Sequence, residues 1–226
     1  MKIISLFNNK GGVGKSTLSY HLGCALAELG KRVLFVDLDP QCNLTINSMF
    51  EEELEDIWAK EEPYMEDFSS ARANFGDEIL ESPRSVHFLL KPVQDGQNDI
   101  DNLPPAKELR ENLWILPGRL SLYQFEATIS DRWNRLYEGD PLSIRTITAF
   151  RTLCQEYGDK YNCDYVIVDT SSSLGVMNKT IISTVDGFFV PTLPDMFSLY
   201  GIKNIGSSLS GRSSLIRLKN LLERIR

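Results

Sequence analysis

Residues 10–17 form a glycine-rich stretch with two lysines, Lys-Gly-Gly-Val-Gly-Lys-Ser-Thr, a combination suited to binding phosphate. The stretch follows a short apolar run at 3–7 and precedes a segment in which leucine and alanine recur at helical spacing. A glycine turn between a strand and a helix exposes backbone N–H groups at the positive end of the helix dipole, which stabilises an anion. The pattern therefore predicts a phosphate site at the start of the helix.

Each residue of this loop has a task in binding a nucleotide. Gly11, Gly12 and Gly14 let the backbone approach the phosphate oxygens, Lys15 neutralises the β- and γ-phosphates, and the Ser16 hydroxyl is suited to ligate Mg²⁺. We expect ATP or ADP and Mg²⁺ as the bound groups. The residues predicted to bind the nucleotide here are Gly11, Gly12, Val13, Gly14, Lys15, Ser16 and Thr17, the last of them at the α-phosphate.

Carboxylates end two apolar strands further along the chain. Asp37 and Asp39 follow the run at 33–36, and Asp169 follows the run at 165–168. Phosphoryl transfer to water needs a group that orients the water and a cation that neutralises the developing charge. Because ligands of parallel α/β sheets bind beyond the carboxyl ends of the strands, we expect these carboxylates to lie near the phosphate loop.

The string KGGVGKST resembles the deviant Walker A box of the ParA/MinD superfamily, in which a second, upstream lysine takes part in the chemistry. The strict pattern G-x-x-x-x-G-K-[ST] fails by one residue, because Asn9 stands where it requires glycine. The upstream lysine would be Lys10, and the lead-in of Asn8 and Asn9 is more similar to ParA than to MinD.

The resemblance extends to the segment Asp37-Leu38-Asp39-Pro40-Gln41-Cys42-Asn43, which is similar to the family's switch I. It implies that Asp39 orients the attacking water and contributes to the metal site, with Asp37 as the secondary candidate. Cys42 stands where the family most often has glycine.

Two later segments complete the resemblance. Asp169 with the following Thr-Ser-Ser-Ser-Leu-Gly resembles the Walker B aspartate and switch II, in which serine here replaces the usual proline. The resemblance implies that Asp169 holds Mg²⁺ through a water. The segment at 191–197 resembles the one that frames adenine, and the implied contacts are Pro191, Pro194, Asp195 and Met196.

Strands alternate with helices along the chain, which predicts an α/β fold with a mostly parallel twisted sheet and helices on both faces. The predicted strands are 3–7, 33–36, 113–116, 165–168 and 187–190. The predicted helices are 16–29, 120–137, 142–158 and most of the chain after 197. Members of the resembled family usually continue past the position of residue 210 into a further strand, so we expect a C-terminally shortened form of the fold.

The 226 residues are expected to form a single P-loop ATPase domain, 1–226. Residues 51–111 hold 17 acidic and 6 basic residues and five prolines, and they are predicted to be an elaboration with a solvated surface. Four scattered cysteines indicate free thiols. With no apolar stretch long enough to span a membrane and no leader at the N-terminus, we expect a cytoplasmic protein.

Together these features predict a Mg²⁺-dependent ATPase of the ParA type, in which ATP closes a homodimer and hydrolysis reopens it. The resemblance implies that Lys10 reaches the phosphates of the other subunit and that turnover is slow. It also implies a role in DNA partition or intracellular cargo positioning, with nonspecific DNA and a stimulating protein as partners. The catalytic residues expected are Lys10, Lys15 and Asp39, and the metal-binding residues are Ser16, Asp39 and Asp169.

Two other functions are consistent with the sequence. A MinD-like, membrane-positioned regulator is the first, because basic and apolar residues alternate at 215–226 as in an amphipathic helix. A nucleotide-dependent interaction module that barely hydrolyses ATP is the second. An iron–sulfur reductase of the nitrogenase iron-protein type is disfavoured, because its cluster cysteines have no convincing counterparts here.

Overall fold

A six-stranded sheet forms the centre of the computed structural model, which describes residues 1–68, 78–97, 102–192, 195–196, 200–203 and 206. In spatial order its strands are β3 (Lys107–Arg110), β4 (Leu113–Leu116), β2 (Val33–Asp37), β5 (Tyr165–Asp169), β1 (Lys2–Leu6) and β6 (Gly187–Phe189). Neighbouring strands of this sheet are parallel except β3 and β4, which pair antiparallel. The predicted fold class, a mostly parallel α/β sheet, is confirmed.

The helices begin and end at recognisable residues. Asp140 caps α8 by accepting a hydrogen bond from the Ser143 amide (2.9 Å), and Ser85 caps α6 in the same way. In chain order the helices are α1 (Lys15–Glu28), α2 (Asn43–Ser48), α3 (Glu51–Glu66), α5 (Glu78–Glu81), α6 (Val86–Gln94), α7 (Tyr123–Arg132), α8 (Pro141–Lys160) and α9 (Val176–Thr184).

The single helix predicted over 120–137 is wrong in its extent. The segment is divided into a 3₁₀ turn (Leu120–Leu122), α7, and a second 3₁₀ turn (Arg135–Glu138). The second turn ends at Gly139, whose φ of 80° lies in the left-handed region that favours glycine.

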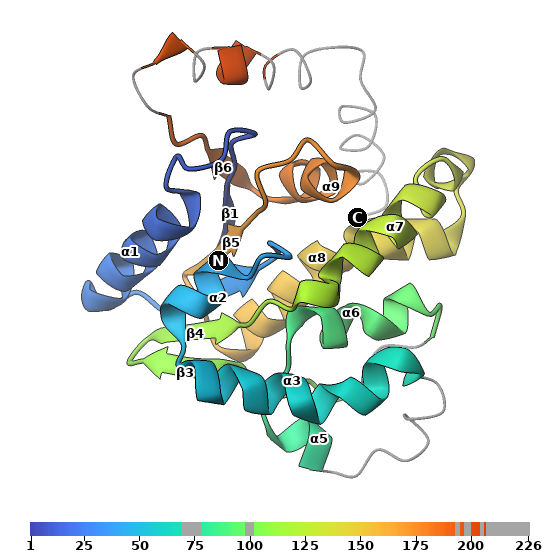
Figure 1. Cartoon of the computed structure of the whole chain (residues 1–226), viewed down its shortest axis with the longest axis horizontal. Coiled ribbons are helices and arrows are strands. Elements are labelled where there is room, and N and C mark those ends of the chain that lie inside the picture. Colours follow the sequence, from blue (N-terminus) through green and yellow to red (C-terminus); the bar gives the residue numbers. More distant parts are fainter. Residues whose placement is uncertain (69–77, 98–101, 193–194, 197–199, 204–205, 207–226) are drawn as a thin grey trace.

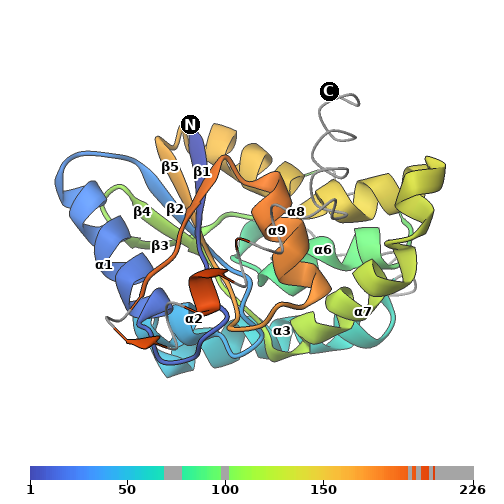
Figure 2. The ribbon, with the colours of Figure 1, turned by 90° about the horizontal axis from the view of Figure 1, so that it is seen from above.

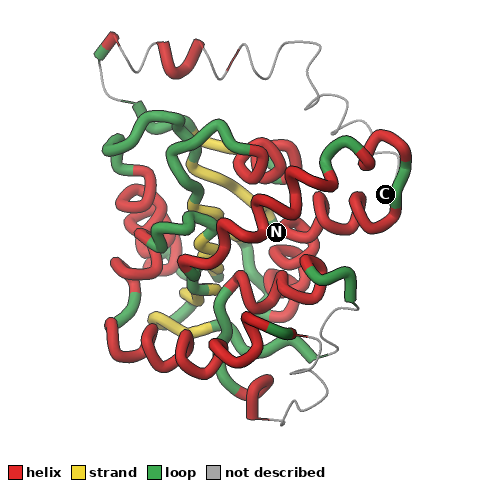
Figure 3. Tube along the Cα trace, turned by 45° about the vertical axis from the view of Figure 1, so that its right-hand side comes forward, coloured by secondary structure: helices red, strands yellow, loops and turns green. Residues whose placement is uncertain are grey.

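Helices cover both faces of the sheet, as Figures 2 and 3 show. Val33 and Phe35 of β2 pack on the side of α1, whereas Leu34 and Val36 join the larger core under α6, α7, α8 and α9. Successive side chains of one strand therefore serve opposite faces, which explains why the strand reads as a continuous apolar run.

The acidic segment at 51–111 is not simply a solvated surface, and that prediction is wrong for its inner side. Figure 1 shows α3 lying along the edge of the molecule beside β3. Leu54 and Ile57 of α3 are buried, and nearly every residue of α6 is buried too. The exposed acidic side chains occupy the outer side of α3, so the segment is a packed elaboration with one charged face.

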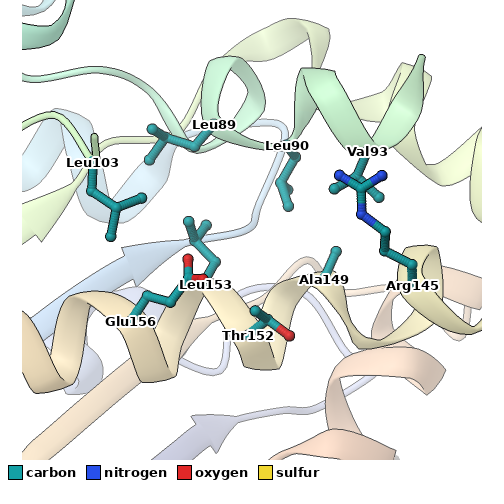
Figure 4. Close-up of a pocket in the computed structure, with 9 residues that line it drawn as sticks. All are labelled: Leu89, Leu90, Val93, Leu103, Arg145, Ala149, Thr152, Leu153 and Glu156. Atoms are coloured by element: carbon teal, nitrogen blue, oxygen red, sulfur yellow. The ribbon is translucent and has the colours of Figure 1, made fainter. Parts of the chain in front are cut away.

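The elaboration joins the core mainly through α6 and α8. Leu89 and Leu90 of α6 face Ala149 and Leu153 of α8 across a small cavity of about 50 Å³ (Figure 4). Burying each of the three leucines contributes roughly 1.5–3 kcal/mol. The contact therefore fixes the elaboration against the sheet.

The basic stretch at 201–226, with the predicted amphipathic helix, lies outside the described residues except at 201–203 and 206. In the part of the chain that the structure describes, none of the helices has the length and apolar character needed to cross a bilayer.

Candidate nucleotide site

The glycine-rich loop turns sharply between β1 and α1. Gly12 and Gly14 have φ angles of 72° and 79°, which side chains with a Cβ rarely adopt, so glycine is required at both positions. The turn brings α1 to its first residue, Lys15, whose side chain is almost completely buried. The predicted arrangement of strand, glycine turn and helix is present.

The three strands that carry the predicted site residues lie side by side. β5 is inserted between β1 and β2, so that Asp169 is level with Leu6 on one side and with Asp37 on the other. The phosphate loop, which leaves β1, and the acidic segment, which leaves β2, therefore meet around the end of β5.

A cavity of about 510 Å³ opens at this edge of the sheet. It is polar, and its walls come from the phosphate loop, the segment after β2 and the loop after β5. The lining residues are Gly11, Gly12, Gly14, Lys15, Ser16, Thr17, Asp39, Gln41, Asn43, Asn47, Ser171, Ser172 and Ser173. Among the residues predicted for the phosphates and the metal, Lys10, Val13 and Asp169 do not line the cavity, and Asp169 is buried behind Ser16, which does.

Asp169 is held by two hydroxyls of α1. Its Oδ2 accepts a hydrogen bond from Ser16 Oγ at 2.6 Å, and its Oδ1 accepts one from Ser19 Oγ at 3.1 Å. Burial raises the pKa of Asp169 to about 6, the charge of Asp39 adds to the rise, and the two hydroxyls oppose it. Ser19 was not predicted, although its spacing of three residues from Ser16 places both on one side of α1.

Asp39 lies on the opposite wall, where backbone and side-chain donors fix its carboxylate. Oδ1 accepts a hydrogen bond from the Gln41 amide at 2.9 Å, and Asn43 Nδ2 lies 3.4 Å from Oδ2. Asn47, one turn further along α2, also lines the cavity. Asp39 thus faces the space where a phosphate and a water would lie.

Asp37 holds the segment after β2 in place through hydrogen bonds and does not line the cavity. Its Oδ2 accepts hydrogen bonds from the amide and the hydroxyl of Thr45 at 2.9 and 2.6 Å, and its Oδ1 accepts one from the Asp39 amide. Burial and the neighbouring Asp169 raise the pKa of Asp37 to about 7. Both oxygens are occupied, so the secondary role given to Asp37 in orienting water does not fit its position.

Cys42 adopts a left-handed conformation in the same segment. Its φ is 55°, in the region that favours glycine, and its side chain is fully buried. Where the resembled family most often has glycine, this chain therefore keeps the glycine-like backbone with a small thiol.

Lys15 reaches across the cavity to the loop after β5. Its Nζ donates a hydrogen bond to Ser172 Oγ. Burial lowers the pKa of Lys15, while Asp169 and Asp39 oppose that change. A buried ammonium group near a polar cavity is suited to bind phosphate oxygens.

Lys10 points elsewhere, toward the segment predicted to frame adenine. Its Nζ forms an ion pair with Asp195 Oδ2 at 2.6 Å, and Asn8 Nδ2 donates to the carbonyl oxygen of Pro191 at 2.7 Å. Met196 is largely exposed, and Pro194 lies outside the described residues. None of the described residues predicted for the base lines the 510 Å³ cavity, so the adenine contacts stay a prediction.

The oxygen donors at the cavity fit Mg²⁺. This ion takes oxygen ligands, and it commonly uses one or two carboxylates together with waters and substrate phosphates. Ser16 Oγ and Asp169 Oδ2 are 2.6 Å apart, and Asp39 is near enough for its charge to raise the pKa of Asp169. Ser16, Asp169 and Asp39 are therefore the residues that would hold the ion.

With this geometry established, comparison with known proteins identifies the family. A family model described as an AAA domain matches residues 1–213. The chain belongs to this family. It is a member of the ParA/MinD superfamily of P-loop proteins, as its relatives and its fold both indicate.

Two relatives illustrate the membership of this ParA/MinD protein. The sporulation initiation inhibitor protein Soj of Bacillus subtilis is 28% identical over 204 residues, which cover 90% of this chain and 63% of Soj. A ParA family protein of Chlamydia pneumoniae is 26% identical over 215 residues, covering 95% and 67% of the two chains. The chain thus spans less than two thirds of Soj.

Solved structures are also similar to this chain in fold. A Corynebacterium diphtheriae protein of 30% identity superposes with a TM-score of 0.76, over 97% of this chain and 69% of that one. Cobyrinic acid a,c-diamide synthase of Mycobacterium smegmatis, solved with an ATP analogue and magnesium, has 25% identity and a TM-score of 0.60. The match covers 94% of this chain and 70% of the synthase.

Proposed function

We propose that this chain is a Mg²⁺-dependent ATPase that works as an ATP-driven dimerisation switch of the ParA type. The observation that carries the proposal is that Lys15, Ser16 and Asp39 line one polar cavity at the carboxyl ends of neighbouring strands, with Asp169 directly behind Ser16. The bound ATP analogue and magnesium in the Mycobacterium synthase structure support the same choice of ligands.

Binding of the nucleotide is the task of the loop and of Lys15. The backbone N–H groups of residues 11–17 surround a phosphate, and the Lys15 ammonium donates to its oxygens from within the cavity. Ser16, Asp169 and Asp39 would hold Mg²⁺, which would supply positive charge to the phosphates. Because the lysine is already desolvated, little water has to be removed from it on binding.

Hydrolysis requires that a water be oriented in line with the terminal phosphate. Asp39 is the group for this step, because it faces the cavity and is held by the Gln41 amide and by Asn43. Its fixed carboxylate accepts a hydrogen bond from the water and restricts the direction of attack.

Lys10 supplies charge to the phosphates of a second copy of the chain. In the single chain its ammonium group is paired with Asp195, so closure of the dimer exchanges that carboxylate for the partner's phosphate oxygens. Closure with ATP and opening after hydrolysis make the cycle a switch.

The output of this switch is DNA partition or the positioning of an intracellular cargo. The ParA family relatives support that role. Nonspecific DNA would bind the ATP-dimer through basic residues, and a partner protein would stimulate hydrolysis. Dimerisation doubles the number of phosphate contacts, so DNA binding should require ATP and weaken steeply with salt.

Analytical ultracentrifugation with ATP and Mg²⁺, paired with an ATP turnover assay, tests the proposal. We expect a dimer with ATP, a monomer with ADP and slow turnover, whereas Lys10→Ala should bind ATP but stay monomeric and inactive. Lys60→Ala, which changes an exposed lysine of α3, is the control.

Three results would contradict the proposal. A Lys10→Ala dimer as stable as the wild type would remove Lys10 from the interface. ATP binding without turnover would favour the interaction module, and sedimentation of the ATP-dimer with liposomes but not with DNA would favour the MinD-like regulator.

A further inference from the structure

In the loop after β5, two of the three serines are held by hydrogen bonds within the loop and from α9. Asn178 of α9 donates to the carbonyl oxygens of Ser171 and Ser173 at 2.9 and 2.8 Å, and the two serine hydroxyls lie 3.2 Å apart. The Ser173 hydroxyl also accepts a hydrogen bond from the Gly175 amide. The hydroxyls of Ser171 and Ser173 are therefore engaged within the loop.

Helix α7 also contacts the region between this loop and α9. Glu126 Oε1 accepts a hydrogen bond from the Met177 amide at 3.4 Å, at the first turn of α9. The same oxygen would lie 2.1 Å from a Cβ added to Gly175, so a side chain at that position would displace the Glu126 carboxylate. Thr170 closes the other end of the loop by donating to the Leu6 carbonyl oxygen.

Ser172 is directed differently, toward the phosphate loop. Its hydroxyl oxygen accepts the hydrogen bond from Lys15 Nζ, and its side chain lines the cavity and is exposed to it. A serine hydroxyl has one donor and two acceptor positions. While Ser172 accepts from Lys15, its own proton is left to donate to a further acceptor in the cavity.

The position of Ser172 indicates which phosphate that acceptor belongs to. In the proposed ATP complex the backbone of residues 11–17 would surround one phosphate, and a phosphate beyond it would project toward the walls built after β2 and β5, which line the same cavity. The acidic group on those walls, Asp39, repels phosphate, whereas Ser172 is neutral and carries a donor. Lys15 touches both regions, because it belongs to the loop and contacts Ser172.

We propose that Ser172 is a specificity-determining residue whose hydroxyl, oriented by Lys15, donates to the terminal phosphate of a nucleoside triphosphate. The site then prefers the triphosphate to the diphosphate, because only the triphosphate carries the phosphate that this hydroxyl contacts. This inference rests on the proposed function, because it assumes that the cavity binds ATP.

Isothermal titration calorimetry with ADP and with a nonhydrolysable ATP analogue, both with Mg²⁺, measures the preference directly. In Ser172→Ala we expect affinity for the analogue to fall by about tenfold, as the loss of one hydrogen bond to a charged group implies, and affinity for ADP to change by less than about twofold. Ser172→Thr keeps the hydroxyl and should restore the preference. Ser183→Ala removes a hydroxyl of α9 that donates to the Lys179 carbonyl oxygen and does not line the cavity, so it should leave the ratio of the two affinities unchanged.

The outcomes separate this inference from the proposed function. If the wild type binds both nucleotides and Ser172→Ala leaves the ratio unchanged, or lowers both affinities equally, the role of Ser172 is wrong and the proposed function stands. If the wild type binds neither nucleotide, both are overturned. Thermal unfolding of each variant checks that the exposed substitution has left the fold intact.

Discussion

Two buried carboxylates, Asp169 at the candidate site and Glu61 in the elaboration, differ in what surrounds them. Both side chains are fully buried, and burial raises the pKa of each. Glu61 accepts hydrogen bonds from the Ser85 amide and hydroxyl and from Arg119 Nη1 at 3.2 Å. Asp169 accepts from two hydroxyls, and within the described part of the chain it forms no ion pair.

The difference is the one expected between a structural carboxylate and one that serves the proposed nucleotide site. A buried charge is costly unless a cation and hydrogen bonds compensate it. Glu61 has its compensating cation in the fold, which joins α3 to Arg119 and so to the segment after β4. Asp169 lies beside a polar cavity with hydroxyl partners alone, which suits a cation that arrives with the nucleotide.

The largest expected effect is a loss of ATP affinity on removal of the Lys15 ammonium group, whose charge also acts on Asp169. Lys15→Ala should lower the affinity for ATP by about a thousandfold, because a cation that donates to two phosphates contributes roughly 3–6 kcal/mol. Calorimetry with ATP and Mg²⁺ measures it, with Lys60→Ala as the exposed control. Affinity close to that of the wild type would contradict the assignment of the phosphate loop.

The structural side of the comparison can be tested in the elaboration. Glu61→Ala should lower the free energy of unfolding by about 3–5 kcal/mol, because it leaves Arg119 largely buried without its buried partner. Glu62→Ala removes the exposed partner of the same arginine and should cost at most about 1 kcal/mol. Urea denaturation compares the two, and equal losses would mean that burial does not distinguish them.

On the functional side, Asp39→Asn should lower ATP turnover by about 100-fold while changing ATP affinity only a few-fold, since the carboxylate acts on the water. The amide oxygen still accepts the hydrogen bond from the Gln41 amide, so the segment keeps its shape. Turnover at the wild-type rate would show that another group orients the water.

The smallest expected effect is a dependence of the free energy of unfolding on pH. Because the pKa of Asp169 in the folded chain is raised to about 6, the folded state holds a proton that the unfolded state has lost between about pH 4 and pH 6. Stability therefore falls as the pH rises through this window. Asp169→Asn should remove that dependence, so its stability relative to the wild type should increase by about 1 kcal/mol between pH 5 and pH 8.

Chemical denaturation at the two pH values, without Mg²⁺, measures this change. The same relative stability at both values would mean that Asp169 is not a buried, uncompensated carboxylate. Adding Mg²⁺ with nucleotide at pH 8 should stabilise the wild type more than Asp169→Asn.

The sequence predicts the central strands and the phosphate loop well, because their signals are local. Continuous apolar runs mark strands buried on both faces, and glycines mark the turn. The edge strand β3 was not predicted, because three of its four residues are charged, none of them is buried, and its pairing with β4 is antiparallel. The helices α3 and α6 contain Pro63 and Pro92, and no helix was predicted in their proline-containing segment.

Within the candidate site, the residues that the sequence did not single out depend on contacts between distant segments. Ser172 meets Lys15 across 157 positions of the chain, and Asn178 acts on the loop from the following helix. Neither hydrophobic periodicity nor a sequence motif predicts contacts between segments so far apart in the chain. The place of Lys10 beside Asp195 likewise follows from packing across 185 positions.

The insertion of β5 between β1 and β2 has a consequence for how the chain folds. β1 and β2 do not pair directly in the described sheet. Leu6, Asp169 and Asp37 become level with one another only when β5, which comes from the last third of the chain, enters between these two strands. Contacts of such long sequence separation form slowly, because the intervening chain must first be ordered. During synthesis, more than a hundred residues separate the phosphate loop from the strand that carries Asp169, so we expect the proposed nucleotide site to form only after β5 has joined the sheet.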